Sequence, residues 1–487
     1  MPRPQTLEEA YRVLADLGQQ LRSLRAQVQR LRAEHARQRE RIRELEARLG
    51  QHSGNSSCPP SSDPPQAPRR PPRPPTGRRR GAQPGHVAHQ RPLAPPDQVD
   101  HAVEHWPPTC PACAAVLPHD PALAVGAAQR HQVRELPPVR ATITEHRLYR
   151  VRCPHCRRET RATLPPGVPA GAFGPRLQAT VATLCGRYRL SRREVAELCR
   201  DVLGAPLAVG SVDALCRSTS AALVAPMAAL HSTLPQAPVV HADETSWKQA
   251  GQRRVLWVVV TRLAVVFTIA TSRGSQVLKD LIGAAFGGYL VSDRWSAYAW
   301  VPVAQRQVCW SHLARNFQGL ADRGGTAAAV GQPAVALTWE LFSAWHAFRD
   351  DHQDRAVLAK AMRPVQEGLR ALLEQGTSNA DGKTQGLCWS LRDLWPALWT
   401  FVTEAGVEPT NNAAERALRP AVLWRKGSFG TQSDGGARFV ERLLTVAATC
   451  RQQGRSLLDY LTAVCTAAQG GHAIPSLLPA TVSAQGP

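Results

Sequence analysis

The sequences APVVHAD at residues 237–243 and GYLVSD at 288–293 are two short apolar runs, and each ends in an aspartate. Short runs bounded by turn residues are typical of buried strands. Acids at the ends of neighbouring strands point to one place, so we expect Asp243 and Asp293 to lie together. The pattern predicts a mixed β-sheet flanked by helices, with a helix at 275–286 and further strands at 254–262, 264–271 and 304–309.

A third carboxylate, Glu415, lies in the sequence NNAAERALR at 411–419. Three acids at one place repel one another unless divalent cations neutralise them. Hard oxygen ligands with open positions suit Mg²⁺ or Mn²⁺, which can hold two oxygens of a phosphate in line for displacement. The three acids therefore indicate a metal-dependent phosphoryl-transfer site.

Two structural interpretations of these acids remain open from the residues alone. Most aspartates that follow strands start turns, because their side chains bond to the backbone ahead. The pattern Asn412-x-x-Glu415 also resembles a helix capping box, with Asn in place of the usual Ser or Thr.

The sequence around the acids resembles the transposases of the insertion sequence 66 family. The motifs, in the family's order, are ADET at 242–245, SDRWSAY at 292–298, CWSHLAR at 309–315, and residues 411–460 with ERALRP, Arg425-Lys426 and Thr449-Cys450. The resemblance also reaches the N-terminal half. It implies a bacterial DDE transposase with an RNase H-like core, in which Asp243, Asp293 and Glu415 bind two Mg²⁺ or Mn²⁺ ions. It also implies DNA as substrate and small accessory proteins of the same element as partners.

Residues 1–50 carry an apolar heptad pattern that predicts a coiled coil and a homo-oligomer. His35 and Gln38 are polar residues that occupy core positions of the heptad pattern without shifting it. The alternative is one long helix packed on the protein's own core. The seam consists of Leu14, Leu17, Leu21, Leu24, Val28, Leu31, Ile42, Leu45 and Leu49.

Residues 51–108 are predicted to form a disordered linker, because thirteen prolines fall between 51 and 100. The sequence NSSCPPSSD at 55–63 resembles a family signature in which the position of Cys58 is commonly Lys; we interpret Cys58 as a surface thiol without function. The linker also holds an arginine run that is either a solvated tail or a phosphate-binding segment: Arg69, Arg70, Arg73, Arg78, Arg79 and Arg80.

Two CxxC motifs, Cys110 with Cys113 and Cys153 with Cys156, predict a zinc-binding domain over 109–165. Paired motifs of this kind in a cytosolic protein indicate a structural Zn²⁺ site with four thiolates. The resemblance agrees, since the family carries a zinc-binding segment here. Alternation within 139–152 predicts a hairpin between the motifs, and His155 is expected to be a bystander.

The pattern over residues 172–234 predicts helices, and Ser191 is expected to cap one of them. A pair of short helices around Gly204 resembles a helix-turn-helix, flanked by Arg187, Arg189, Arg192 and Arg193. A helical packing domain is an equally good interpretation. The catalytic core is predicted at 235–320.

The core is expected to resume at 409–468 after an α-helical insertion at 321–408. The insertion is rich in tryptophan, which at helical spacing is more typical of a packed core than of a DNA wedge: Trp339, Trp345, Trp389, Trp395 and Trp399. Basic residues after Glu415 are candidates for holding DNA phosphates: Arg416, Arg419, Arg425, Lys426 and Arg438. A helix at 437–450 follows a turn at 433–436, and residues 469–487 are expected to form a loose tail.

The formal net charge of +21 favours a polyanionic partner such as DNA. The apolar stretch at 255–271 is too short for a membrane span and the first residues lack a signal-peptide pattern, so we expect a cytoplasmic, nucleoid-associated protein. The preferred interpretation is a transposase that cuts transposon ends and joins them to target DNA. A nuclease that cuts without joining, or an inactive DNA-binding remnant, are the alternatives.

Overall fold

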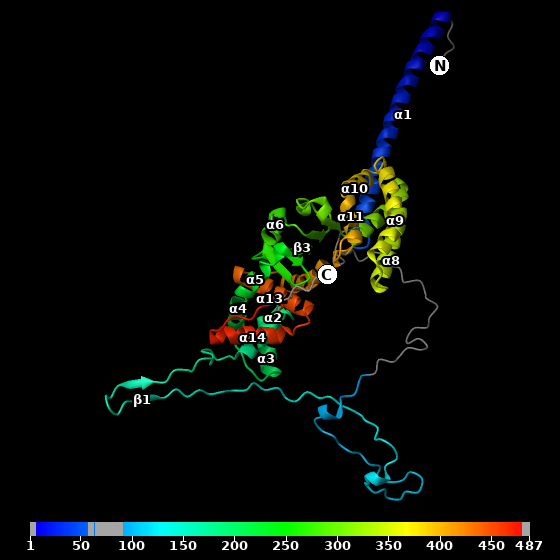
Figure 1. Cartoon of the computed structure of the whole chain (residues 1–487). Helices are drawn as coiled ribbons and strands as arrows, with labels where there is room; N and C mark the ends of the chain where they lie inside the picture. Colours follow the sequence, from blue (N-terminus) through cyan, green and yellow to red (C-terminus); the bar gives the residue numbers. More distant parts are fainter. Residues whose placement is uncertain (1–5, 57–62, 64–90, 480–487) are drawn as a thin grey trace. The chain divides into compact units, whose positions relative to one another are not determined.

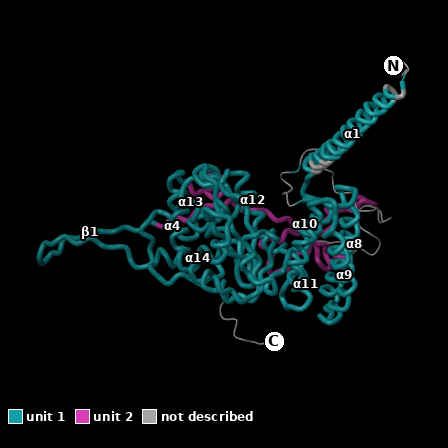
Figure 2. The backbone as a smooth tube through the Cα atoms, turned by 90° about the horizontal axis from the view of Figure 1, so that it is seen from above, with its two compact units in different colours: residues 1–69, 145–197, 207–487 teal, residues 70–144, 198–206 magenta. Residues whose placement is uncertain are grey.

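The computed structural model describes residues 6–56, 63 and 91–479. The chain forms two units, drawn in different colours in Figure 2, and each is described by itself. The larger unit comprises residues 1–69, 145–197 and 207–487, and the smaller comprises 70–144 and 198–206. The arginine run of the linker and Cys58 lie outside the described residues.

A five-stranded mixed sheet is the centre of the larger unit, as predicted (Figure 1). Its order is β5-β4-β3-β6-β7, with β3, β4 and β5 antiparallel and β3, β6 and β7 parallel. Helix α6 (Ser275–Ile282) lies between β5 and β6 in the sequence and stops at Gly283, whose φ is +86°. The strands are β3 (Val239–Gln249), β4 (Gln252–Val260), β5 (Val265–Ala270), β6 (Tyr289–Ser292) and β7 (Arg306–Val308).

Strand β3 continues six residues beyond Asp243, so the prediction that this strand ends at Asp243 is wrong. The continuation pairs with β4 as far as Gln249 opposite Gln252, and Trp247 is buried. Ala250 and Gly251 connect the two strands with positive φ values of 48° and 76°. Two such residues make the turn that matches the twist of a tight hairpin.

Helices α12 (Asn412–Ser428) and α13 (Asp434–Gln452) pack on the face of the sheet that carries Trp247 and Val258. The turn predicted at 433–436 is instead the start of α13, because the Ser433 side chain accepts a hydrogen bond from the Gly436 N–H. The side chain of Ser433 therefore caps the helix.

Helix α13 also covers the free edge of β5. Side chains one helical turn apart accept hydrogen bonds from alternate N–H groups of that strand, which would otherwise be an open sheet edge. The pairs are Glu441 with Ile269 (2.5 Å), Thr445 with Phe267 (2.9 Å) and Thr449 with Val265 (3.1 Å).

Helices fill the segment between β7 and α12, which includes the range 321–408 where an α-helical insertion is predicted. It has its own apolar core, in which Trp399 is buried and Trp345 and Trp395 pack at the margin. Trp339 and Trp389 are exposed, so the expectation that all five tryptophans form the core is wrong for these two. The helices are α7 (Trp310–Arg323), α8 (Gly325–Asp350), α9 (Arg355–Gly376), α10 (Gly382–Asp393) and α11 (Trp395–Thr403).

The segment before the sheet is helical, as predicted. Ser191 forms a capping box with Glu194, each side chain bonded to the other's backbone N–H. Arg192 contacts Asp213 at 3.4 Å and lies over the Phe439 ring, so it is a packing residue. The helices are α2 (Pro175–Gly186), α3 (Arg192–Asp201), α4 (Val209–Ala222) and α5 (Val224–His231).

The segment after α14 (Leu457–Gly470) is held in place as far as Leu477. Leu477 is fully buried, and its carbonyl accepts hydrogen bonds from Gln453 and Arg455. The expectation of a loose tail from residue 469 is therefore wrong for this part.

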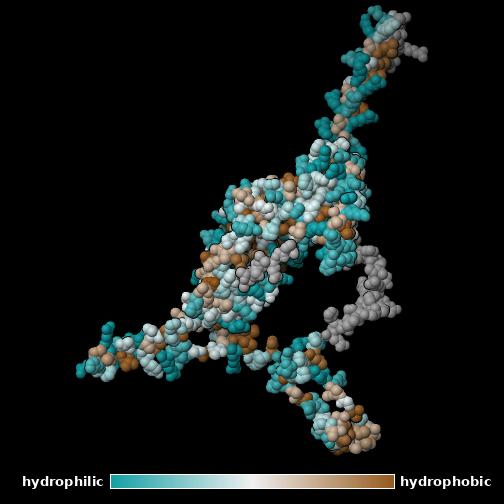
Figure 3. Space-filling model, viewed as in Figure 1, coloured by the Kyte–Doolittle hydropathy of each residue, from teal (hydrophilic) through white to brown (hydrophobic). Residues whose placement is uncertain are grey.

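Helix α1 (Leu7–Leu49) carries the heptad seam, and the seam side chains are exposed along its length (Figure 3). The alternative of a helix packed on the protein's own core therefore receives no support from the described residues. After α1, the Asn55 side chain donates a hydrogen bond to Asp322 of α7 (3.0 Å). The Asn55 carbonyl lies so close to Gly319 that a Cβ there would be 2.5 Å away. Within the described residues, no helix has the length and apolarity to cross a bilayer.

Candidate active site

The strand register brings Asp243 and Asp293 to the same level of the sheet. Strands β3 and β6 run parallel, with His241 opposite Val291. Each aspartate lies two residues beyond that pair, and side chains two apart in a strand share a face. The Asp293 carboxylate also accepts the Trp295 N–H at 2.8 Å, so it starts a turn as well.

Asn411 joins the start of α12 to β3 and to the end of β7. Its Nδ2 donates to the Ala242 carbonyl (2.8 Å), and its Oδ1 lies 3.3 Å from His241 Nδ1, which donates. Its backbone N–H donates to the Cys309 sulfur (3.2 Å). The side chain is buried. Asn411 therefore fixes the first turn of α12, which carries Glu415, against the strand of Asp243.

The capping-box interpretation of Glu415 is wrong. The N-cap of α12 is Asn411 rather than Asn412, and no side-chain hydrogen bond caps this end of the helix. A capping box would place the acid three residues after the cap, whereas Glu415 is four residues after it. Its Oε1 is buried and makes no hydrogen bond.

The three acids perturb one another electrostatically. Burial and the negative charges of Glu244, Asp293 and Glu415 hold the pKa of Asp243 well above its usual range. Burial likewise raises the pKa of Glu415, against the opposing charges of Arg315 and Arg416. Crowded carboxyl groups of this kind are stable together only if they are protonated or neutralised by cations.

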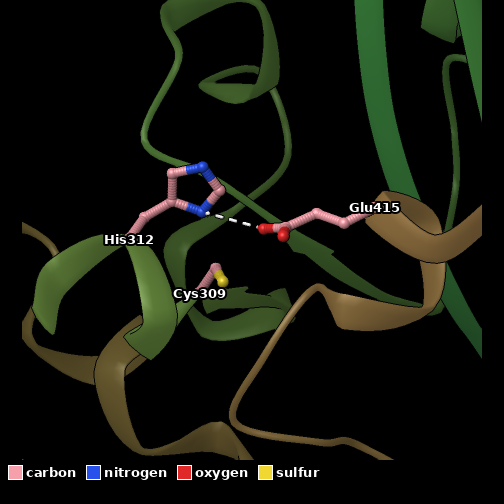
Figure 4. A group of neighbouring side chains, drawn as sticks. All are labelled: Cys309, His312 and Glu415. Carbon is pink, nitrogen blue, oxygen red and sulfur yellow. Dashed lines mark ion pairs between the residues drawn. The ribbon is translucent and has the colours of Figure 1, made fainter. Parts of the chain in front are cut away.

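His312 and Cys309 lie beside Glu415, a grouping that the sequence interpretation did not place at the site (Figure 4). His312 Nδ1 is 3.4 Å from Glu415 Oε1, and Arg315 Nη2 is 3.9 Å from the same oxygen. Burial and the charges of Arg315 and Arg294 lower the pKa of His312 to about 4. The contact drawn as an ion pair in Figure 4 is therefore between a neutral imidazole and a carboxyl group at neutral pH.

The chain also matches a known protein family. Residues 170–439, more than half of the chain, match the model of the transposase IS66 family. The chain belongs to the IS66 transposase family. Residues 14–92 match a second model, described as a family of unknown function.

Two relatives from Sinorhizobium fredii resemble this family member over part of their length. One, described as uncharacterized protein y4qI, is 31% identical over 234 residues, which is 44% of this chain and 42% of that protein. The other, uncharacterized protein y4hP, is 25% identical over 321 residues, 58% of this chain and 57% of that protein. The chain thus spans about half the length of these curated relatives.

Glu244, next to Asp243 in this IS66-family chain, points to the opposite face of the sheet. Its carboxylate accepts hydrogen bonds from Arg273 Nε (2.6 Å) and the Tyr298 hydroxyl, and its side chain is only 2% exposed. Tyr298 in turn packs edge-on against Trp257. Glu244 thus ties β3 to the loop after Asp293, a role that the motif ADET did not reveal.

The basic residues expected to hold phosphates differ in their surroundings. Arg425 is engaged by β3, where its Nη1 donates to Thr245 Oγ1 (3.0 Å) and to Ser246. Burial lowers its pKa. Arg416, Arg419 and Lys426 are exposed. The exposed three therefore remain the better candidates for phosphate contact.

Both CxxC motifs fold into the same turn, one in each unit. The carbonyl of the first cysteine accepts the N–H four residues ahead (2.8 Å), and its N–H donates to the carbonyl five ahead (2.9 Å), at Cys110 and at Cys153 alike. Ala114 and Arg157 both adopt left-handed conformations, with φ of 57° and 60°. Backbone N–H groups directed at the sulfur lower the pKa of the Cys110 and Cys153 thiols.

The hairpin predicted within 139–152 is not formed. Instead β1 (Arg150–Arg152) pairs with β2 (Glu159–Arg161) across the second CxxC turn. Val139 and Ile143 are exposed, so a hairpin at this place would have no apolar surface to pack against. A two-stranded ribbon is marginal without such a face.

Proposed function

We propose that this chain is a DNA transposase that cuts transposon ends and joins them to target DNA by a DDE mechanism. The observation that carries the proposal is the convergence of Asp243 on β3, Asp293 after β6 and Glu415 on α12 beside the inner strands of a mixed sheet. The buried Glu415 oxygen without a hydrogen-bond partner fits a divalent cation better than it fits a purely structural role.

The acids are proposed to hold two Mg²⁺ or Mn²⁺ ions. Such ions supply an activated nucleophile and neutralise the charge that develops on the phosphate. The chain itself positions the three carboxylates. Strands β3 and β6 hold Asp243 and Asp293 side by side, and Asn411 holds the first turn of α12, which carries Glu415, against β3.

The proposed reaction has two steps at one site. Hydrolysis of the phosphodiester at the transposon end frees a 3′-OH. That hydroxyl then attacks a phosphodiester of target DNA, so one bond forms as another breaks and no covalent protein intermediate is needed. Exposed Arg416, Arg419 and Lys426 are proposed to hold backbone phosphates during both steps.

Strand order and direction support an RNase H-like core, made of residues 235–320 and 409–468 around the helical insertion at 321–408. Three antiparallel strands followed by two parallel ones, with acids on β3, after β6 and on a covering helix, fit this assignment. The helices at 172–234 are proposed to contact DNA and α1 to self-associate. Accessory proteins of the same element stay a proposal from the family resemblance.

The two matching CxxC turns support a structural Zn²⁺ held by Cys110, Cys113, Cys153 and Cys156. Their turn geometry directs backbone N–H groups at the sulfur and favours the thiolate form that binds zinc.

A strand-transfer assay with pre-cut transposon ends separates the three functions. Joined product identifies a transposase, cut product alone identifies a nuclease, and a gel shift without either identifies a binding remnant. Glu415→Gln is expected to fold and bind DNA yet neither cut nor join, as are Asp243→Asn and Asp293→Asn. The matched control is Glu408→Gln, which alters an exposed acid of the preceding loop. Near-wild-type joining by Glu415→Gln would refute the acid triad.

A further inference from the structure

We propose that His312 is a nitrogen ligand of the metal ion held by Glu415, so that the site binds metal through mixed nitrogen and oxygen donors. The inference rests on the proposed function, because it adds a ligand to the same site. It concerns the ring of His312 in the first turn of α7, which faces Glu415 in the first turn of α12 (Figure 4).

Two buried atoms without a hydrogen bond face each other at this point. His312 Nδ1 and Glu415 Oε1 are both inaccessible, and neither makes a hydrogen bond. Buried polar atoms are nearly always satisfied, so an adjacent unsatisfied pair calls for a missing partner. Each atom offers a lone pair when the imidazole is neutral with its proton on Nε2.

The separation of the two atoms suits a shared ion. They lie 3.4 Å apart. Two neighbouring donors with bonds of about 2.1 Å to one octahedral ion lie about 3.0 Å apart at the ideal 90° angle, and about 3.4 Å apart when that angle opens to about 110°. A direct hydrogen bond would instead bring the nitrogen and oxygen to about 2.9 Å. The pair makes no hydrogen bond at its observed spacing, so the structure does not show His312 orienting Glu415 in this way.

Cys309 is the third possible donor nearby, with its sulfur within 4.8 Å of the other two atoms. Its sulfur is already engaged, because it accepts the Asn411 N–H at 3.2 Å. The side chain is fully buried at the N-terminus of α7. We therefore assign Cys309 to the positioning of α12 and His312 alone to the metal.

A nitrogen ligand changes which ion the site prefers. Mg²⁺ favours all-oxygen coordination, whereas imidazole suits transition metals. The site is therefore expected to bind Mn²⁺ at least tenfold more tightly than Mg²⁺. Removal of the imidazole should reduce this preference mainly by weakening Mn²⁺ binding.

The decisive experiment is electron spin echo modulation of Mn²⁺ bound to the full-length, zinc-loaded, tag-free protein. Directly coordinated imidazole nitrogen gives a characteristic modulation. We expect it in the wild type and in the control His231→Gln, which removes a histidine of α5. We expect its loss in His312→Gln, with Mn²⁺ binding about tenfold weaker in a titration and Mg²⁺ binding changed less. Gln keeps a hydrogen-bond donor, so a merely orienting role would be largely rescued.

The outcomes separate this inference from the proposed function. Bound Mn²⁺ without nitrogen modulation in the wild type, or with modulation that survives in His312→Gln, overturns the role of His312 and leaves the acid triad intact. Absence of Mn²⁺ binding to the wild type overturns both. The wild-type spectrum alone decides the matter if His312→Gln does not fold.

Discussion

Replacement of Asn411 by alanine should disconnect Glu415 from the strand that carries Asp243. The amide group makes two buried hydrogen bonds, to the Ala242 carbonyl at 2.8 Å and with His241 Nδ1 at 3.3 Å. In Asn411→Ala both partners stay buried and lose their contact. The backbone N–H bond to Cys309 remains.

The expected cost follows from these two contacts. A buried polar group left without its partner costs about 1–3 kcal/mol, so the pair should destabilise the core by about 3 kcal/mol. The larger unit has about 400 residues, so 1 kcal/mol corresponds to about 1 °C in Tm, which predicts a fall of about 3–4 °C. Because α12 also loses its tie to β3, Mn²⁺ affinity should fall at least tenfold in the fraction that remains folded.

The assay is thermal unfolding with a parallel Mn²⁺ titration well below the transition. Asn412→Ala is the matched control, since it makes the same chemical change one residue along the chain. Asn412 has no side-chain hydrogen bond within the described residues, and its replacement should shift Tm by no more than about 1 °C. If Asn411→Ala and Asn412→Ala unfold at the same temperature and bind Mn²⁺ equally, Asn411 does not anchor α12 and our account of the site is wrong.

Four other outcomes are expected. Thr445→Val keeps the shape of its side chain but leaves the Phe267 N–H unpaired, so chemical denaturation should show a loss of about 1–3 kcal/mol; an unchanged midpoint would contradict the edge-strand role of α13. Ala250→Asn suits the left-handed turn better and should raise stability by about 1 kcal/mol, and a lower Tm would count against the turn. Elemental analysis should find about one Zn²⁺ per chain, lost in Cys113→Ser, whereas full zinc in a Cys110/Cys153 double serine variant would exclude the four-cysteine site. Sedimentation of a peptide of residues 1–50 should show a helical oligomer that Leu24→Pro disrupts, and a monomer at high concentration would refute the coiled coil.

The strands of the sheet were predictable because their chemistry is local. Runs such as VLWVVV at 255–260 bury both faces and are bounded by turn residues, so composition and length are enough to place them. The length of β3 was not predictable in the same way. Beyond Asp243 its exposed positions are polar, as at Lys248, and its strand character comes from pairing with β4.

The contacts that build the site are distant in sequence, and no local pattern signals them. Asn411 meets Ala242 across 169 positions, and the motif NNAAER identifies neither partner. The CxxH pattern at Cys309 and His312 resembles half of a zinc site, but no second such pair lies near it in the sequence. The structure separates its two members instead, with the sulfur toward Asn411 and the imidazole toward Glu415.

Two acids near Glu415 in the sequence could compete for its role, and their positions argue against both. Glu404 lies beside Tyr289 and raises the pKa of its hydroxyl. Tyr289 begins β6, whereas Asp293 follows the end of that strand. A four-residue strand rises by about 10 Å or more, so Glu404 lies near the opposite end of β6 from Asp293. Glu408 is exposed on the loop, and its charge is absent from the interactions that shift the pKa of Asp243, to which Glu415 contributes. Of the three acids between 404 and 415, Glu415 alone therefore shares an electrostatic environment with both aspartates.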